Sequence, residues 1–279
     1  MQLKLFQEQI FFATVRITVG AGVGTSIGTG FLYSVPVSPD KTCILLVSNR
    51  HVYVDPGQPI NLLFHKRDPN DPSRPMLGEF HAISGNGFEG VYTGHPNSSV
   101  DLACINVSQI AGEGIFYKNL TDSMLADFSH ESLLPGNEVW FIGYPENRFD
   151  TKHNLPILRR GYIASIPKVG FEGHEEFLVD AQVLRGSSGS PVFTVLGGEY
   201  KLIGVVAQTM IKNEKLQTVP AAHAIGIQQT LGLGIVLRAS LLKELLSAAT
   251  AEIRARFALH QPEPNVDIQA SEQAAPADG

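Results

Sequence analysis

A serine surrounded by small residues is the first candidate for chemistry in this chain. Ser188 lies in segment 185–191, which reads RGSSGSP. A nucleophilic serine needs a sharply turned backbone that presents amide N–H groups to a developing oxyanion, and glycine adopts the required dihedral angles at little cost. A Gly/Ser turn or linker is the alternative, but the strand-like run 192–194 follows at once. The segment therefore predicts a nucleophile loop around Ser188.

Two further residues supply what such a serine needs, because a hydroxyl is a weak nucleophile without a base and a group that orients the base. His51 follows the apolar run 43–48, and Asp101 opens the apolar run 102–105. Each has an ordinary alternative, since His51 is one of nine histidines and an aspartate that starts a strand is usually a turn residue. In combination with Ser188, however, they predict a catalytic triad of His51, Asp101 and Ser188.

The order of these residues along the chain distinguishes between the folds in which such triads occur. The order His, Asp, Ser is that of chymotrypsin-type enzymes, whereas α/β-hydrolases run Ser, acid, His. The only aspartates after Ser188 are Asp267 and Asp278, and no histidine follows them. The subtilisin order would need Asp40 before the histidine, in an all-β context that does not match that fold.

The elements that must position the triad are short strands. The chain has 279 residues with 27 glycines and 17 prolines, a composition that favours many strands and tight turns. Apolar runs of strand length rich in Val, Ile, Phe and Tyr recur, and no long helical periodicity is visible before about residue 237. These runs are 11–19, 30–35, 43–48, 60–65, 102–107, 138–143, 160–166, 176–179, 191–194 and 200–208. The pattern predicts an all-β fold.

Eight motifs in this order resemble those of the trypsin-like serine peptidases, and within them the bacterial HtrA-type protease domains. The resemblance covers about residues 24–246 and implies two six-stranded antiparallel Greek-key β-barrels with the active site between them, followed by a C-terminal α-helix. The matching segments are GTGF at 28–31, SNRHV at 48–52, DLA at 101–103, GNEV at 136–139 with IGYP at 142–145, GYIAS at 161–165, GSSGSP at 186–191, LIGVV at 202–206 and GLGIVL at 232–237.

The resemblance assigns a role to each triad member. Ser188 would attack the scissile carbonyl, His51 would take its proton and return it to the leaving amine, and Asp101 would hold the imidazole in place. The backbone N–H groups of Gly186 and Ser188 would form the oxyanion hole. Ser187 stands where zymogen-activated relatives have an aspartate, so activation by that salt bridge is not expected.

The resemblance also suggests where substrate would bind. Gln182 would lie near the floor of the S1 pocket, and Ala207, Gln208 and Thr209 would line the strand edge that pairs with a polypeptide substrate. Because no aspartate stands at the floor, we expect a small or medium apolar P1 residue rather than Arg or Lys.

Domain boundaries follow from the same pattern. The peptidase domain is expected over residues 1–246, with a first barrel at about 10–125 and a second at about 133–238. A C-terminal helix is expected at 239–260, because apolar residues recur there at helical spacing. The tail 261–279 is rich in Pro, Glu, Gln and Ala and is predicted to be disordered. No peptide-binding PDZ module is expected after the helix.

Composition argues against other classes of function. The formal net charge is −6 with scattered Lys and Arg, which disfavours nucleic-acid binding. No histidine or cysteine pair has metal-ligand spacing and no Walker-type loop is present, so neither metal nor cofactor is expected. Cys43 and Cys104 are the only cysteines; we interpret them as small buried hydrophobic residues, with a single disulfide or a redox role as alternatives.

The partners and the location are expectations of the same kind. We see neither a signal peptide nor a membrane span, and so expect a cytoplasmic protein. Polypeptide substrates are the expected partners, together with a regulatory protein that would restrain a peptidase in that compartment. The alternative to an active endopeptidase is a trypsin-like module that is catalytically silent, or active only with a partner, and that binds peptides or proteins.

Overall fold

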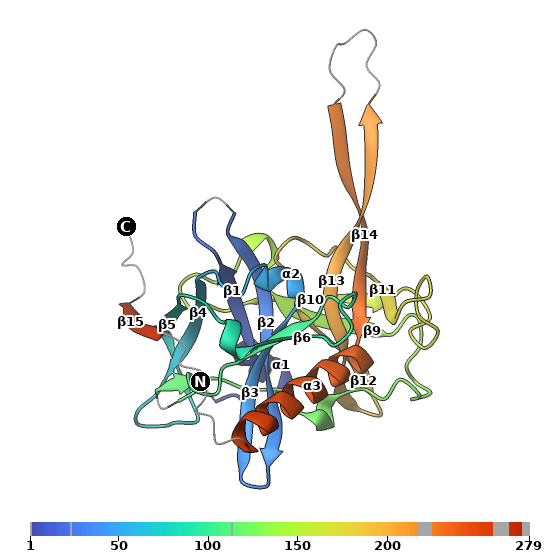
Figure 1. Cartoon of the computed structure of the whole chain (residues 1–279). Coiled ribbons are helices and arrows are strands. Elements are labelled where there is room, and N and C mark those ends of the chain that lie inside the picture. Colours follow the sequence, from blue (N-terminus) through green and yellow to red (C-terminus); the bar gives the residue numbers. More distant parts are fainter. Residues whose placement is uncertain (1, 23, 113, 217–224, 259–267, 275–279) are drawn as a thin grey trace.

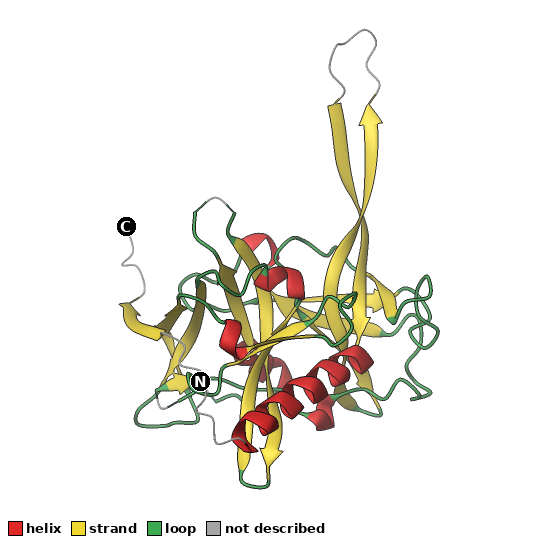
Figure 2. Cartoon of the chain, in the orientation of Figure 1, coloured by secondary structure: helices red, strands yellow, loops and turns green. Residues whose placement is uncertain are grey.

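The computed structural model describes residues 2–22, 24–112, 114–216, 225–258 and 268–274. Strands dominate this part of the chain, and helices are few (Figures 1 and 2). The strands form two units, one of which is a closed barrel. The triad candidates come from both units, so the packing between them decides how the site is assembled.

The first unit is a sheet of nine strands in the order β15-β5-β4-β1-β2-β3-β7-β6, with β8 paired to β4. Its paired neighbours run antiparallel. The strands are β1 (Thr14–Val19), β2 (Ser26–Ser38), β3 (Lys41–Ser48), β4 (Ile60–Arg67), β5 (Pro75–Gly85), β6 (Tyr92–Gly94), β7 (Ala103–Asn106), β8 (Ile115–Phe116) and β15 (Ile268–Ala274).

The second unit is a closed barrel in the order β10-β11-β14-β13-β12-β9, again with antiparallel pairs. Its strands are β9 (Glu138–Gly143), β10 (Ile157–Ile163), β11 (Glu176–Asp180), β12 (Pro191–Leu196), β13 (Glu199–Leu216) and β14 (Ile225–Arg238). Beyond the barrel, β13 and β14 continue as a long two-stranded hairpin that projects from the body of the molecule (Figure 1).

The predicted fold class is confirmed, with one difference in the first unit. The second barrel has the six strands that were expected. In the first unit the end strands β5 and β6 do not pair with each other in the described part of the chain. The outer edge of β5 is occupied by β15, and β6 is only three residues long. This unit is therefore a curved sheet with two ends rather than a closed six-stranded barrel.

Three α-helices complete the described structure: α1 (Phe6–Ala13), α2 (Arg50–Tyr53) and α3 (Ala239–Ala258). Short 3-10 turns lie at η1 (Glu89–Val91), η2 (Asp122–Met124) and η3 (Pro145–Asn147). Helix α3 runs obliquely across the lower part of the molecule in the view of Figure 1. One hydrophobic core contains residues of both units and of α3, and it holds them together. It includes Tyr33, Leu45, Phe193, Leu202, Leu242 and Leu245.

Strand β1 shows how the alternation of residue types places side chains. Val15, Ile17 and Val19 are buried, while Arg16 and Thr18 between them are half-buried. Successive side chains of a strand point to opposite faces, so the apolar set enters the core of the first unit. Arg16 is left on the other face, where it lies opposite Thr29 of β2.

The segment predicted as a strand over 11–19 begins as a helix instead. The side chain of Glu8 accepts hydrogen bonds from the amides of Lys4 and Leu5, at 3.0 and 3.1 Å, and so stabilises the start of α1. Phe6 then packs on the second barrel, where its ring lies 4.7 Å from that of Tyr200. This distant contact favours the helix, and the strand begins only at Thr14.

The prediction of a disordered tail over 261–279 is wrong for Ile268–Ala274. These residues form β15, whose register on β5 runs from the pair Ile268 and Gly85 to the pair Ala274 and Glu79. An edge strand offers unpaired backbone groups, so a segment can pair with it without large apolar side chains. The rest of the tail lies outside the described residues, as does the end of the helix predicted to reach residue 260.

Cys43 and Cys104 are both buried in the core that joins the two units. Burial raises the pKa of the Cys104 thiol well above its usual value. Two buried thiols in an apolar core agree with the interpretation that these cysteines serve as small hydrophobic residues.

Candidate active site

His51 and Asp101 meet at the edge of the first unit. His51 lies on α2, just after β3, and Asp101 lies just before β7. Oδ2 of Asp101 is 2.6 Å from Nδ1 of His51, and Oδ1 accepts the His51 amide at 3.0 Å. A carboxylate can only accept, so in the neutral imidazole Nδ1 carries the proton and Nε2 keeps its lone pair. The imidazole is thus held in the tautomer that a general base requires.

The backbone around Asp101 is fixed by residues next to His51. The side-chain amide of Asn49, which is fully buried, donates to the Asp101 carbonyl at 2.8 Å. The guanidinium of Arg50 donates to the carbonyls of His95 and Ser98, at 2.9 and 3.0 Å. The segment that leads to Asp101 is therefore fastened to the helix that carries His51.

Ser188 lies in the loop between β11 and β12, where two glycines have left-handed dihedrals. Gly186 has φ +83° and Gly189 has φ +86°. A Cβ on Gly186 would lie 2.3 Å from the carbonyl oxygen of Tyr144, and one on Gly189 would lie 1.9 Å from that of Thr29. Only glycine fits these positions, so the small residues noted in the sequence are required by the shape of the loop.

The Ser188 hydroxyl donates to the carbonyl of Ala207 at 3.1 Å. No hydrogen bond joins it to His51 among the residues that the structure describes. Ser188 and His51 nevertheless lie on segments that are bonded to one another. Thr29 donates its amide to the Ser188 carbonyl, and Ser48, three positions before His51, donates its hydroxyl to the Thr29 carbonyl at 2.6 Å.

The two amides predicted to form the oxyanion hole differ from their neighbours in the loop. The Ser187 amide donates to Leu184 at 3.0 Å, and the Gly189 amide donates to Val206 at 2.9 Å. The amides of Gly186 and Ser188 have no acceptor within the described ranges. Both N–H groups are therefore available to a ligand oxygen.

Thr29 is a site residue that sequence reasoning missed. It is fully buried, its amide donates to the Ser188 carbonyl at 3.0 Å, and its hydroxyl donates to the Gly186 carbonyl at 2.7 Å. The same hydroxyl accepts the Tyr144 amide at 3.0 Å. The motif GTGF contains Thr29, but nothing local to it signals bonds to residues more than 100 positions away.

Replacement of Thr29 by valine should destabilise the protein by about 2 kcal/mol, because it leaves the part-buried carbonyl of Gly186 and the buried amide of Tyr144 without partners. Thr29→Ser keeps the hydroxyl and should cost less. Urea or thermal unfolding of the two variants beside wild type measures the difference. Equal stability of the valine and serine variants would show that the hydroxyl bonds contribute nothing.

The residues predicted to bind substrate lie on β13 and before the nucleophile loop. Ala207 is buried and Gln208 exposed, while the Thr209 hydroxyl donates to the Val183 carbonyl at 2.5 Å. Pairing of β12 with β13 ends at Val205, so past that residue β13 has one edge without a strand partner in the described structure. Gln182 is exposed, and its carbonyl accepts a hydrogen bond from Arg159.

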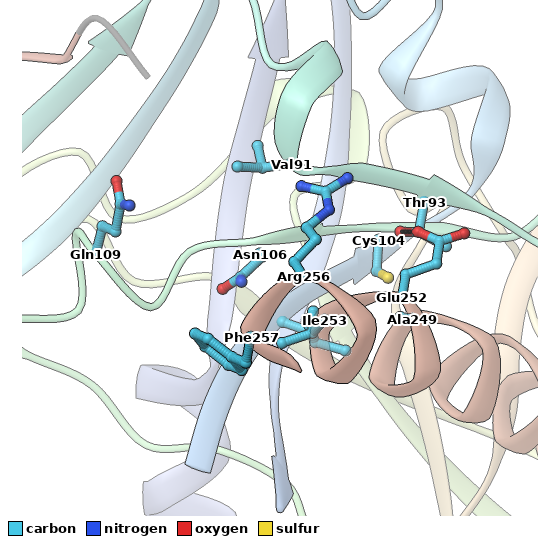
Figure 3. Close-up of a pocket in the computed structure, with 11 residues that line it drawn as sticks. Val91, Thr93, Cys104, Asn106, Gln109, Ala249, Glu252, Ile253, Arg256 and Phe257 are labelled. Carbon is cyan, nitrogen blue, oxygen red and sulfur yellow. Dashed lines mark hydrogen bonds between the residues drawn. The ribbon is translucent and has the colours of Figure 1, made fainter. Parts of the chain in front are cut away.

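A small cavity of about 30 Å³ lies between α3 and strands β6 and β7 (Figure 3). Beside it, Glu252 accepts a hydrogen bond from the Thr93 hydroxyl at 2.7 Å, and Arg256 donates to the Gly90 carbonyl. None of the residues that line it belongs to the predicted triad. We interpret it as a packing void where α3 is anchored to the first unit.

No group of three or more His, Cys, Asp or Glu side chains within the described ranges is arranged to hold a metal ion. Among the same residues, no helix is both long enough and apolar enough to cross a membrane.

Comparison with known proteins identifies a family. The family model described as trypsin-like peptidase domain matches residues 28–205, which include all three triad candidates. No curated protein gives a significant match. The resemblance drawn from the eight motifs is thereby confirmed at the level of the family.

Two solved structures are similar to this chain. The serine endoprotease from Yersinia pestis has a TM-score of 0.50 and 15% identity, with 88% of this chain and 65% of that chain covered. The HtrA-type protease AlgW, solved with a tripeptide, has a TM-score of 0.47 and 17% identity, covering 88% and 62%. At 15% identity the first similarity shows the fold alone. The chain spans less than two thirds of the length of either protein.

Proposed function

The chain belongs to the trypsin-like peptidase domain family, a class of serine endopeptidases, and on that premise we propose that it cleaves peptide bonds with His51, Asp101 and Ser188 as its triad. One observation carries the assignment. A single carboxylate, that of Asp101, bonds both the amide and Nδ1 of His51 and so leaves Nε2 as a proton acceptor. The residues match the roles that a serine nucleophile requires.

The reaction proceeds through an acyl-enzyme. Ser188 Oγ attacks the scissile carbonyl while His51 Nε2 takes the hydroxyl proton, and the imidazolium is stabilised by Asp101. The oxyanion accepts hydrogen bonds from the amides of Gly186 and Ser188. Collapse of this intermediate passes the proton from His51 to the leaving amine and forms the Ser188 ester. Water, deprotonated by His51, then attacks the ester, and the proton passes from His51 to Ser188 Oγ as the acid product leaves.

Substrate binding completes the triad. In the free protein the Ser188 hydroxyl donates to the carbonyl of Ala207. A substrate that pairs with the open edge of β13 would direct the amide of its P1 residue, the residue that supplies the scissile carbonyl, to the same acceptor. The substrate amide displaces the hydroxyl, which rotates towards His51. This competition also supports regulation, because a peptidase whose serine hydroxyl is bonded to a main-chain carbonyl and not to its base is silent until the edge is occupied.

This exchange predicts a dependence on the P1 amide hydrogen. A peptidyl phosphonate inhibitor N-methylated at the P1 nitrogen should inactivate the protein at least about tenfold more slowly than its unmethylated counterpart, the size of one lost hydrogen bond. Both the maximal inactivation rate and the affinity for the inhibitor should fall, since the Ser188 hydroxyl stays hydrogen-bonded to the Ala207 carbonyl. Equal maximal rates for the two inhibitors would contradict the exchange.

Polypeptides are the substrates that the family implies. We propose a preference for a small or medium apolar P1 residue, because position 182 is occupied by glutamine and not by aspartate. Incubation with a mixture of proteome-derived peptides, followed by mass spectrometry, tests both the activity and the preference. Cleavage by wild type and not by Ser188→Ala is expected. Intact peptides in both samples would favour the alternative of a silent or partner-activated binding module. A cytoplasmic location and a regulatory partner stay predictions from the sequence.

A further inference from the structure

The turn that follows β9 holds two non-glycine residues in the left-handed region. Glu146 has φ 50° and Asn147 has φ 57°. Side chains with a Cβ adopt this region only at a cost in free energy, and such strain persists where the surroundings hold it in place. Both residues are exposed, so burial of their side chains does not compensate for the strain. The compensation must come from contacts that the turn makes.

One such contact reaches the nucleophile loop. The amide of Glu146 donates to the carbonyl of Arg185 at 2.6 Å. This carbonyl shares a planar trans peptide with the amide of Gly186, so the C=O and N–H groups point in opposite directions. The hydrogen bond from the turn fixes the direction of the Arg185 carbonyl. The Gly186 N–H must therefore point away from the turn, where it has no acceptor among the described residues.

A second contact ties the turn to the first unit. Nε of Arg16 donates to Oδ1 of Asn147 at 2.7 Å, and the guanidinium carbon lies 5.3 Å from the centre of the Phe149 ring. Arg16 is half-buried, and no ion pair joins it to a carboxylate in the part of the chain that the structure describes. On β1 it lies opposite Thr29, whose hydroxyl holds the Gly186 carbonyl.

We propose that Arg16 is a positioning residue for the oxyanion hole. Through Asn147 and Phe149 it holds the strained turn, and the turn orients the Arg185–Gly186 peptide so that the Gly186 amide faces the oxyanion. The first unit thus orients both sides of Gly186, with Thr29 on its carbonyl and Arg16, acting through the turn, on its amide. The inference rests on the proposed function and deepens it.

Arg16→Ala should lower kcat for a peptide substrate about tenfold, because the turn can then relax and the Gly186 amide loses its fixed direction. The effect lies below the 10²- to 10³-fold loss typical of removing an oxyanion donor outright. KM should change less than about twofold, since ground-state binding does not use this amide. Arg160→Ala removes an exposed arginine from another strand and serves as the control, with kcat unchanged.

A double-mutant cycle tests the pathway through the turn. Asn147→Ala should show the same loss of kcat as Arg16→Ala, and the double variant should lose little more than either single one. Fully additive losses would contradict a shared pathway. Glu146→Gly in the Arg16→Ala background should restore several-fold of the lost kcat, because glycine holds the left-handed conformation without help. A further loss on this change would contradict the role of strain.

A transition-state readout separates positioning from general destabilisation. A peptide boronate forms a tetrahedral adduct with an oxyanion, so its affinity should fall about tenfold in Arg16→Ala, while the affinity of the matching peptide that lacks the P1 carbonyl should not change. Equal losses for both ligands, or none for the boronate, would overturn the inference while leaving the proposed function intact. A wild-type protein that neither cleaves peptides nor binds the boronate would instead overturn the proposed function itself, and the inference with it.

Discussion

Ser188→Ala should lower kcat for a peptide substrate by about 10⁶, the size of loss that follows removal of a serine nucleophile elsewhere. Without Oγ no acyl-enzyme can form, and only the oxyanion amides and substrate binding remain to accelerate attack by water. The loop itself should keep its shape, because its fixed hydrogen bonds use the backbone, including the Ser188 carbonyl bonded to Thr29. Steady-state kinetics with a fluorogenic peptide measures the loss.

The neighbouring serine gives a matched control for this variant. Ser187 is buried in the same loop. Ser187→Ala should stay within about tenfold of wild type, since its hydroxyl has no role in the proposed chemistry. A Ser188→Ala protein that retained more than about one per cent of wild-type kcat would exclude Ser188 as the nucleophile.

Asp101→Asn should lower kcat by about 10⁴ at neutral pH with the fold intact, as the corresponding change does in the well-studied enzymes of this class. The asparagine can keep the hydrogen bond to the His51 amide through its carbonyl oxygen. Its NH₂ group then faces Nδ1 of His51, which must accept rather than donate. The proton moves to Nε2, and the imidazole can no longer serve as a base.

A second aspartate in a similar bond controls for the loss of a charge. Asp122 accepts a hydrogen bond from the Tyr33 hydroxyl at 2.8 Å, and neither residue has a role in the proposed chemistry. Asp122→Asn should leave kcat within a few-fold of wild type. An Asp101→Asn protein with kcat close to that of Asp122→Asn would mean that the bond between Asp101 and His51 has no catalytic role.

The proposed triad could be named from the sequence because each candidate residue sits in a local pattern. Small residues mark the loop of Ser188, and apolar strand runs flank His51 and Asp101. Chain order then restricts the fold class, since few folds place a histidine, an aspartate and a serine in that succession. The structure brings His51 and Asp101 within 2.6 Å, a geometry that the separation of 50 residues could not predict.

The supporting residues could not be predicted, because they lack the local patterns that mark the triad. Thr29 acts on Gly186 across 157 positions, and Arg16 acts on Asn147 across 131 positions. Neither residue lies in a local sequence pattern that would indicate its role. A threonine or an arginine in a strand usually indicates only which face of the strand is exposed. The direction of the Ser188 hydroxyl, towards Ala207, is likewise a property of the folded loop and not of the motif.

Two of the errors in the fold share a cause in contacts between distant segments, and another arises within the hairpin of β13 and β14. Helix α1 replaces the start of a predicted strand because Phe6 reaches the second barrel. Strand β15 forms in a tail that lacks large apolar residues because the edge of β5 supplies backbone partners. Strand β13, expected to end at residue 208, continues to Leu216 as one arm of the long hairpin.

The central claim is that this chain carries an assembled serine nucleophile, and covalent labelling tests it most directly. Purified wild-type protein would be incubated with a peptidyl phosphonate probe, whose P1 amide can pair with the open edge of β13, beside Ser188→Ala, and the intact mass and the labelled peptide would be read by mass spectrometry. We predict one adduct on wild type, located at Ser188, and none on the variant. Folded wild-type protein that takes up no label, or that takes it up on another residue, would contradict the claim.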